Sequence, residues 1–177
     1  MILDWLLSFT GSSPSSPTDS PTTGTQVASN IVDLGVISGI PSSANGGGAR
    51  DMGVGDAPAL KLSAVVTTAF ASGTSLQLEL SGAPDNGSGV PGSYTVMWLG
   101  PAVVEANLVA GMQIANIDVP RPVAGQVLPR FLRLRYITVG THTAGAIEAN
   151  IVIDRDDQIV GATGLYSGYP AGITVAN

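Results

Sequence analysis

Residues 76–80 read Leu-Gln-Leu-Glu-Leu, and residues 132–136 read Leu-Arg-Leu-Arg-Tyr. In both stretches apolar and polar side chains alternate, which is the period of a β-strand with one buried and one solvated face. A third stretch, Ala149-Asn-Ile-Val-Ile-Asp154, follows this period more loosely. The alternation predicts that Gln77 and Glu79 point to solvent while the opposite face forms the core. The predicted core residues are Leu76, Leu78, Leu80, Leu132, Leu134 and Tyr136.

Further β-rich stretches flank these two, and residues that favour turns separate them. The turn residues include Asn45-Gly-Gly-Gly48, Pro84–Gly89, Pro120-Arg-Pro122 and Gly140, which supply fixed or positive φ. The sequence thus contains about eight expected strands separated by turn residues, and it contains no helical pattern of ten or more residues. This organisation predicts an all-β fold, namely an antiparallel two-sheet sandwich with the connectivity of a jelly roll. The expected strands are residues 27–36, 59–70, 75–81, 94–99, 113–119, 131–139, 146–154 and 173–176.

The first 25 residues differ in composition from the rest. Residues 1–10 are mostly apolar, and residues 11–25 are rich in Ser, Thr and Pro, which is typical of an extended or mobile linker. We therefore expect an N-terminal arm and linker over residues 1–25 and a jelly-roll domain over residues 26–177. The arm either reaches a neighbouring chain or folds back on its own domain, and the sequence leaves both open. The residues expected to make this contact are Ile2, Leu3, Trp5, Leu6 and Phe9.

Composition limits the classes of function. The 177 residues carry a net charge of −6 with a pI near 4.4, and an acidic surface repels phosphate backbones, so we expect no nucleic-acid partner. We interpret Arg130, Arg133 and Arg135 as strand surface charges that pair with nearby acids. No apolar run approaches the roughly 20 residues that span a bilayer, so we expect no membrane partner. Without cysteine there are no disulfides or thiolate metal sites.

Catalytic patterns are weak. His142 is the only histidine, and we interpret it as a solvated turn residue between two strands. Asp154-Arg-Asp-Asp157 is the densest acidic cluster, but it lacks the spacing of a calcium loop. Gly53-Val-Gly55 lacks the rest of a nucleotide-binding motif. Trp98 is expected in the core. We therefore expect no enzyme active site, no metal and no cofactor.

Several short motifs occur in an order that resembles a known family, the jelly-roll capsid cement proteins of short-tailed phages, of the type described from a Bordetella phage. The similarity extends from Ser29 to Asp157 and includes the first few residues. The Ser/Pro linker, residues 84–92 and the tail after Gln158 depart from the family pattern. The motifs are Ser29-Asn-Ile-Val-Asp-Leu-Gly35, Ala49-Arg-Asp-Met-Gly-Val-Gly-Asp-Ala-Pro58, Asn107-Leu-Val-Ala-Gly-Met112, Arg130-Phe-Leu-Arg-Leu-Arg-Tyr136 and Thr143-Ala-Gly-Ala-Ile147.

The resemblance implies a non-enzymatic decoration protein of the virion. Such a protein binds the outer surface of a shell of HK97-type major capsid protein and bridges neighbouring subunits of that shell. The resemblance also implies a symmetric homo-oligomer, and we expect a dimer rather than a trimer. The alternative from the residues alone is a carbohydrate-binding jelly-roll module, although exposed aromatic residues are scarce.

Overall fold

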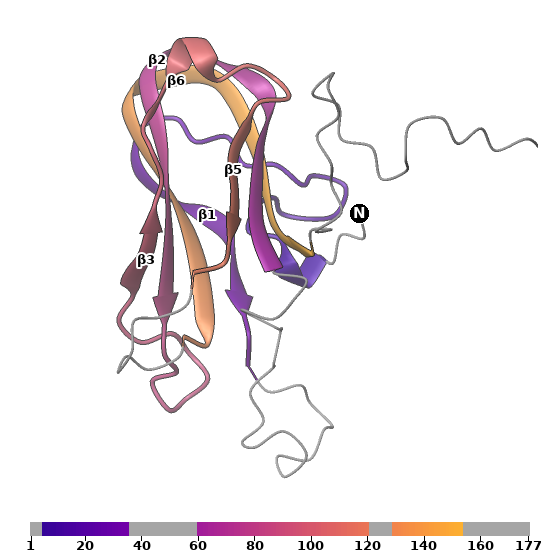
Figure 1. The fold of residues 1–177 in the computed structure, drawn as a ribbon, viewed down its shortest axis with the longest axis vertical. Coiled ribbons are helices and arrows are strands. Elements are labelled where there is room, and N and C mark those ends of the chain that lie inside the picture. The colour runs from indigo at the N-terminus through magenta and orange to yellow at the C-terminus, as the bar shows by residue number, and fades with distance from the viewer. Residues whose placement is uncertain (1–4, 36–59, 121–128, 154–177) are drawn as a thin grey trace, which may run out of the picture.

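The computed structural model describes residues 5–35, 60–120 and 129–153, and these residues are mostly β-structure (Figure 1). The all-β prediction is confirmed, and the expected strand 173–176 lies outside the described residues. No helix in the described ranges is long and apolar enough to cross a membrane. The elements are η1 (Trp5–Leu7), β1 (Gly24–Asp33), β2 (Leu60–Ala83), β3 (Thr95–Leu99), β4 (Val103–Val104), η3 (Glu105–Asn107), β5 (Gln113–Asp118) and β6 (Phe131–Ile153), where η marks a 3-10 turn.

The long strands β2 and β6 pair with each other along nearly their whole length. Their antiparallel ladder runs from Leu60 opposite Ile153 to Ala83 opposite Phe131. β1 pairs with β6, whereas β3, β4 and β5 pair with β2, and every pairing is antiparallel. We call β1, β3 and β4 with residues 75–83 and 131–139 the first half-sheet. The second half-sheet consists of β5 with residues 60–66 and 146–153.

Both long strands bend where one half-sheet passes into the other. The ladder shifts register repeatedly between Val66 and Ser75, and Gly140 takes a left-handed φ of 77°. Gly145 also has a positive φ, and a Cβ there would lie 2.4 Å from the Phe70 ring. Irregularities of this kind bend a strand without ending it. The sheet therefore curls over on itself, as Figure 1 shows.

The predicted two-sheet jelly roll is not confirmed, because all six strands belong to one hydrogen-bonded sheet. The expected strands 59–70 and 75–81 are both parts of β2, and the expected strands 131–139 and 146–154 fall on β6. The physical reason is that Gly140 and its neighbours, which the pattern marks as strand breakers, form bulges inside a continuous strand.

The core lies between the two halves of the curled sheet. All six core residues predicted from the alternation are buried, which confirms that part of the analysis. Trp98 is partly buried against this core. Facing the six predicted residues in the same cluster are side chains of the second half-sheet: Leu62, Ala64, Val66, Ile147, Ala149 and Ile151.

Residues 8–22, which we call the N-terminal clasp, close one side of the curled sheet. The backbone N–H of Phe9 donates to the carbonyl of Ala149 at 2.9 Å, and the N–H of Asn30 donates to the carbonyl of Phe9 at 2.8 Å. Phe9 thereby links β1 to the second part of β6. Asp19 and Ile147 exchange two further backbone hydrogen bonds. The clasp thus joins strand edges that belong to different half-sheets.

Polar side chains hold the clasp in place. The carboxylate of Asp19 accepts hydrogen bonds from the backbone N–H of Gly11, from the N–H and hydroxyl of Ser29, and from the Tyr136 hydroxyl at 2.9 Å. The hydroxyl of Thr10 accepts from the N–H of Ala149 and donates to the carbonyl of Pro17. A buried polar group is costly unless it is hydrogen-bonded, so these contacts allow a Ser/Pro-rich segment to lie against the core.

Of the two arrangements left open for the arm, the structure shows the folded-back one in its described part. Ser8, Phe9 and Thr10 are buried, and the Phe9 ring belongs to the core cluster.

The clasp predicts that Phe9 contributes strongly to stability. Phe9→Ala removes a fully buried ring and is expected to lower the free energy of unfolding by about 3–5 kcal/mol, measured by urea denaturation. Leu6→Ala serves as the control, because Leu6 is exposed and is expected to change stability by about 0.5 kcal/mol. Equal, small effects of the two substitutions would contradict this role of the clasp.

Tyr136 predicts loss of stability at alkaline pH. Burial, together with the neighbouring Asp19 carboxylate, raises the pKa of Tyr136 well above its usual value of 10.0. The stability linked to the neutral phenol is therefore complete below pH 10 and is lost as the pH rises beyond it. Tyr136→Phe, which cannot ionise, is expected to flatten the fall in melting temperature above pH 10. If the melting temperatures of the two proteins fall equally with pH above pH 10, ionisation of Tyr136 does not contribute to the loss of stability.

Candidate interaction surface

The predicted arm residues do not gather on one exposed surface. Phe9 is buried in the core of its own chain, whereas Leu6 exposes 61% of its surface. Trp5 begins η1, and Ile2 and Leu3 lie outside the described residues. The two arm residues whose side chains are described therefore occupy opposite environments.

A second surface carries far more exposed apolar area. It is the side of the first half-sheet that faces away from the core, and we call it the outer face. Val27, Ile31, Val96, Leu99, Val104 and Val139 are each about half exposed there. Residues paired across neighbouring strands form four rows on this face. Two rows cross β1, β6, β2 and β3, and they are Val27–Arg135–Glu79–Leu99 and Ile31–Arg133–Ser81–Val96. The other two rows cross three strands each: Val139–Ser75–Val104 on β6, β2 and β4, and Thr25–Ile137–Gln77 on β1, β6 and β2.

Two arginines occupy the middle of the outer face. Nη2 of Arg135 lies 3.3 Å from Oε2 of Glu79. Arg133 stacks over the Tyr94 ring, 3.7 Å from its centroid, and its Nε donates to the Ser81 hydroxyl at 3.3 Å. Glu79 was expected to be solvated, but only 6% of it is exposed, and its carboxylate lies against Arg135.

The outer side of the second half-sheet has a different character. Its cross-strand neighbours include Lys61 opposite Asp118 and Ser63 between Asn116 and Asn150, with Glu148 opposite Val65. Its aliphatic members, Val65 and Val152, are not exposed. Solvent-exposed aliphatic residues are therefore concentrated on the outer side of one half-sheet.

An ion-pair cluster borders the outer face at the end of β1. The guanidinium of Arg130 donates to Asp33 at 2.9 Å and also contacts Asp85, so it ties β1 and the loop after β2 to the start of β6. This hydrogen bond from Arg130 holds the pKa of Asp33 below its usual value. With the Arg135–Glu79 contact, the cluster confirms that Arg130 and Arg135 pair with nearby acids.

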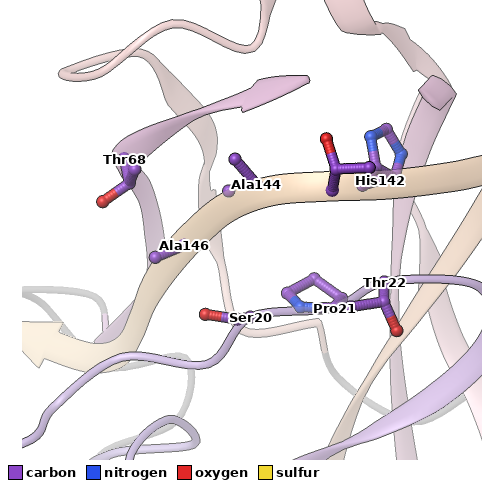
Figure 2. Close-up of a pocket in the computed structure, with 9 residues that line it drawn as sticks. Ser20, Pro21, Thr22, Thr68, His142, Ala144 and Ala146 are labelled. Atoms are coloured by element: carbon purple, nitrogen blue, oxygen red, sulfur yellow. The ribbon is translucent and has the colours of Figure 1, made fainter. Parts of the chain in front are cut away.

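A shallow pocket lies between the clasp and the bend of β6. Its cavity measures about 320 Å³, and Figure 2 shows residues 20–22 running beside the stretch of β6 that carries Ala144 and Ala146. The lining is made of methyl and hydroxyl groups and includes one ionisable residue, His142. The described residues contain no cluster of three or more His, Asp or Glu that could hold a metal, and Asp154–Asp157 lies outside the described part of the chain.

The interpretation of His142 as a solvated turn residue is wrong. His142 lies within β6 and is 2% exposed. Its ring packs edge-on against Phe70 at a centroid distance of 5.0 Å, and Nε2 lies 3.4 Å from the carbonyl oxygen of Ser75. The strand continues through the bulges near Gly140, so a residue that the pattern places in a turn becomes part of the interior. The ring has a packing role at the bend.

Sequence reasoning missed the outer face, although one signal for it is present. In residues 131–139 the positions in phase with Arg133 and Arg135 are Phe131, which is buried, Ile137 and Val139. The predicted solvent face of this strand therefore turns aliphatic towards its end. An amphipathic strand normally keeps its exposed side polar, so the aliphatic residues at the end of this side depart from the expected pattern.

Comparison with known protein families gives a match over most of the chain. The sequence model of the Bbp16 family matches residues 18–151, which include only the last residues of the clasp, 18–22, and every strand of the described sheet apart from the last residues of β6. No curated protein sequence matches the chain.

The position of His142 predicts a structural effect. His142→Ala leaves a cavity beside Phe70 at the bend of both long strands and is expected to cost about 2–3 kcal/mol of stability. Thr141→Ala, at an exposed neighbour in the same strand, is expected to stay within about 0.5 kcal/mol. Urea denaturation of both variants measures the difference. A His142→Ala protein as stable as the wild type would mean that the ring is not part of the packed interior.

Proposed function

Because the chain belongs to the Bbp16 family of phage proteins, which indicates a structural protein associated with the virion, we propose that it is a capsid cement protein. In this role it binds the outer surface of a shell of HK97-type major capsid protein. It bridges neighbouring shell subunits and stabilises the DNA-filled head.

The outer face is the observation that supports this role best. It combines about half-exposed aliphatic side chains with a rigid antiparallel ladder. Exposed apolar patches of this kind mark protein–protein contact sites. A decoration protein needs such a surface and needs no catalytic group.

The mechanism is mechanical. Packaged DNA presses outwards on the shell and separates neighbouring subunits, so a protein bound to two subunits must be released before they part. We propose that the chain acts as a homo-oligomer, with a dimer favoured over a trimer. Linking weak contacts within one oligomer raises the overall affinity by about 10²–10⁴. The net charge of −6 suits a protein outside the shell, away from the packaged DNA.

Other functions have less support. The pocket beside the clasp brings no acid–base pair together, since its ionisable member, His142, is turned into the interior. A carbohydrate-binding surface normally displays aromatic rings, but Trp98 is partly buried against the core. We therefore propose that the chain is not an enzyme and binds no cofactor, nucleic acid or membrane.

The role is tested with heads assembled without this protein. Added protein is expected to co-sediment with the heads at saturable occupancy and to raise the temperature at which they release DNA. The control is an unrelated acidic β-protein at the same concentration. Absence of co-sedimentation, or occupancy that leaves the release temperature unchanged, would contradict the cement role.

A further inference from the structure

We propose that the outer face is the surface that docks on the shell, and that the shell presents an aliphatic patch bearing carboxylates to it. This inference rests on the proposed cement function. It adds to that function the contact surface on this chain and the chemistry of the partner.

The apolar part of the surface supports docking. Val96, Leu99 and Val104 lie along one side of the outer face, and Val27 and Ile31 lie along the other. The clasp contacts β1 at Ser29 and Asn30, between Val27 and Ile31. Val27 and Ile31 nevertheless remain about half exposed beside it. Burying such side chains against a partner is favourable, because it removes apolar surface from water.

The charges of the surface indicate what the partner carries. Two guanidinium groups, those of Arg133 and Arg135, lie in the outer face with one carboxylate, that of Glu79. Glu79 is buried against Arg135, so this pair carries no net charge, and Arg133, which stacks on Tyr94, supplies the net positive charge of the face. The whole chain is acidic, with a net charge of −6. A negatively charged partner is therefore repelled by the acidic chain as a whole and attracted to the arginines of the outer face. This difference favours encounters in which the outer face meets the partner.

The same charges argue against a second copy stacked on this face. A twofold axis through the face would bring Arg133 and Arg135 against their own copies. The acids at its border, Asp33 and Asp85, lie with Arg130 at the end of β1, where Asp33 is paired with Phe131 and not with Arg133 or Arg135. Like charges brought together at an interface weaken binding. Homo-oligomer contacts, where they form, are expected on another surface.

The backbone beneath the surface is preorganised. Each exposed aliphatic residue of β1, β3 and β4 is paired with β6 or β2. The side-chain amide of Gln77 also donates to the carbonyl of Gly100 at 2.7 Å, which fixes the chain just after Leu99. A rigid surface loses little entropy on binding, so the outer face is ready to bind without rearrangement.

Paired substitutions of opposite charge test both parts of the inference. Val96 lies opposite Ser81 and Val139 lies opposite Ser75, so a new charge at either position has no charged residue directly across from it. Val96→Glu and Val139→Glu are compared with Val96→Lys and Val139→Lys. Val109→Glu and Val109→Lys are the controls, because Val109 is 54% exposed, like Val96, and lies outside the outer face. Circular dichroism verifies folding, and co-sedimentation with heads lacking the protein measures affinity.

The Glu variants are expected to bind about tenfold more weakly or worse. The Lys variants are expected to stay within about threefold of the wild type, and the Val109 variants within about twofold. Wild-type affinity in all variants would overturn the docking surface while leaving the cement function intact. Equal losses of affinity for the Glu and Lys variants would overturn the proposal that the partner carries carboxylates at this contact. Folded variants that bind heads normally but change oligomeric state would show a second copy on this face. Failure of the wild type to bind heads would overturn the proposed function and this inference together.

Discussion

The antiparallel pairing of β2 with β6 determines the rest of the structure. Every other described strand is attached to one of these two, and the shared ladder carries both halves of the core. Because the ladder bends between Val66 and Ser75, its two halves face each other and bury the aliphatic side chains of both. A straight ladder of the same sequence would leave one of its faces in water. The bend therefore converts a long hairpin-like pair into a fold with an interior.

Closure of that fold requires the N-terminal clasp. A curled sheet has open edges, and unpaired strand edges attract other chains. Phe9 connects β1 to the second part of β6, and the Asp19 carboxylate gathers hydrogen bonds from the clasp, from β1 and from Tyr136 on β6. The edge of β3 has no such cover among the described residues, where β3 is the last strand of the sheet order. The closed and open sides of the molecule thus differ, and the exposed aliphatic residues Val96 and Leu99 lie on the open one.

The sequence predicted the strands better than their connections. Alternation in residues 76–80 and 132–136 correctly identified the core residues, because side-chain period two depends only on the local backbone. The same reasoning read Gly140 as the end of a strand and His142 as solvated, because a bulge and a turn use the same residue types and differ only in the pairing across the sheet. The folded-back position of Phe9 depends on hydrogen bonds with Asn30 on β1 and with Ala149, which lies more than a hundred positions away, and no local pattern contains these contacts. The outer face was predictable in part, because Ile137 and Val139 are aliphatic residues on the side of β6 that the alternation assigns to polar residues.

The structure and the family together give one account of the molecule. The bend folds the two half-sheets onto each other and the clasp joins their edges, and the outer face of the first half-sheet carries exposed aliphatic side chains with two arginines at its centre. Backbone amide hydrogen exchange, with and without heads that lack the protein, tests this account most directly. It predicts slower exchange in Thr95–Leu99 and Gly24–Asp33 on binding and unchanged exchange in Gln113–Asp118 on the second half-sheet. Protection confined to Gln113–Asp118, with Thr95–Leu99 unaffected, would contradict it.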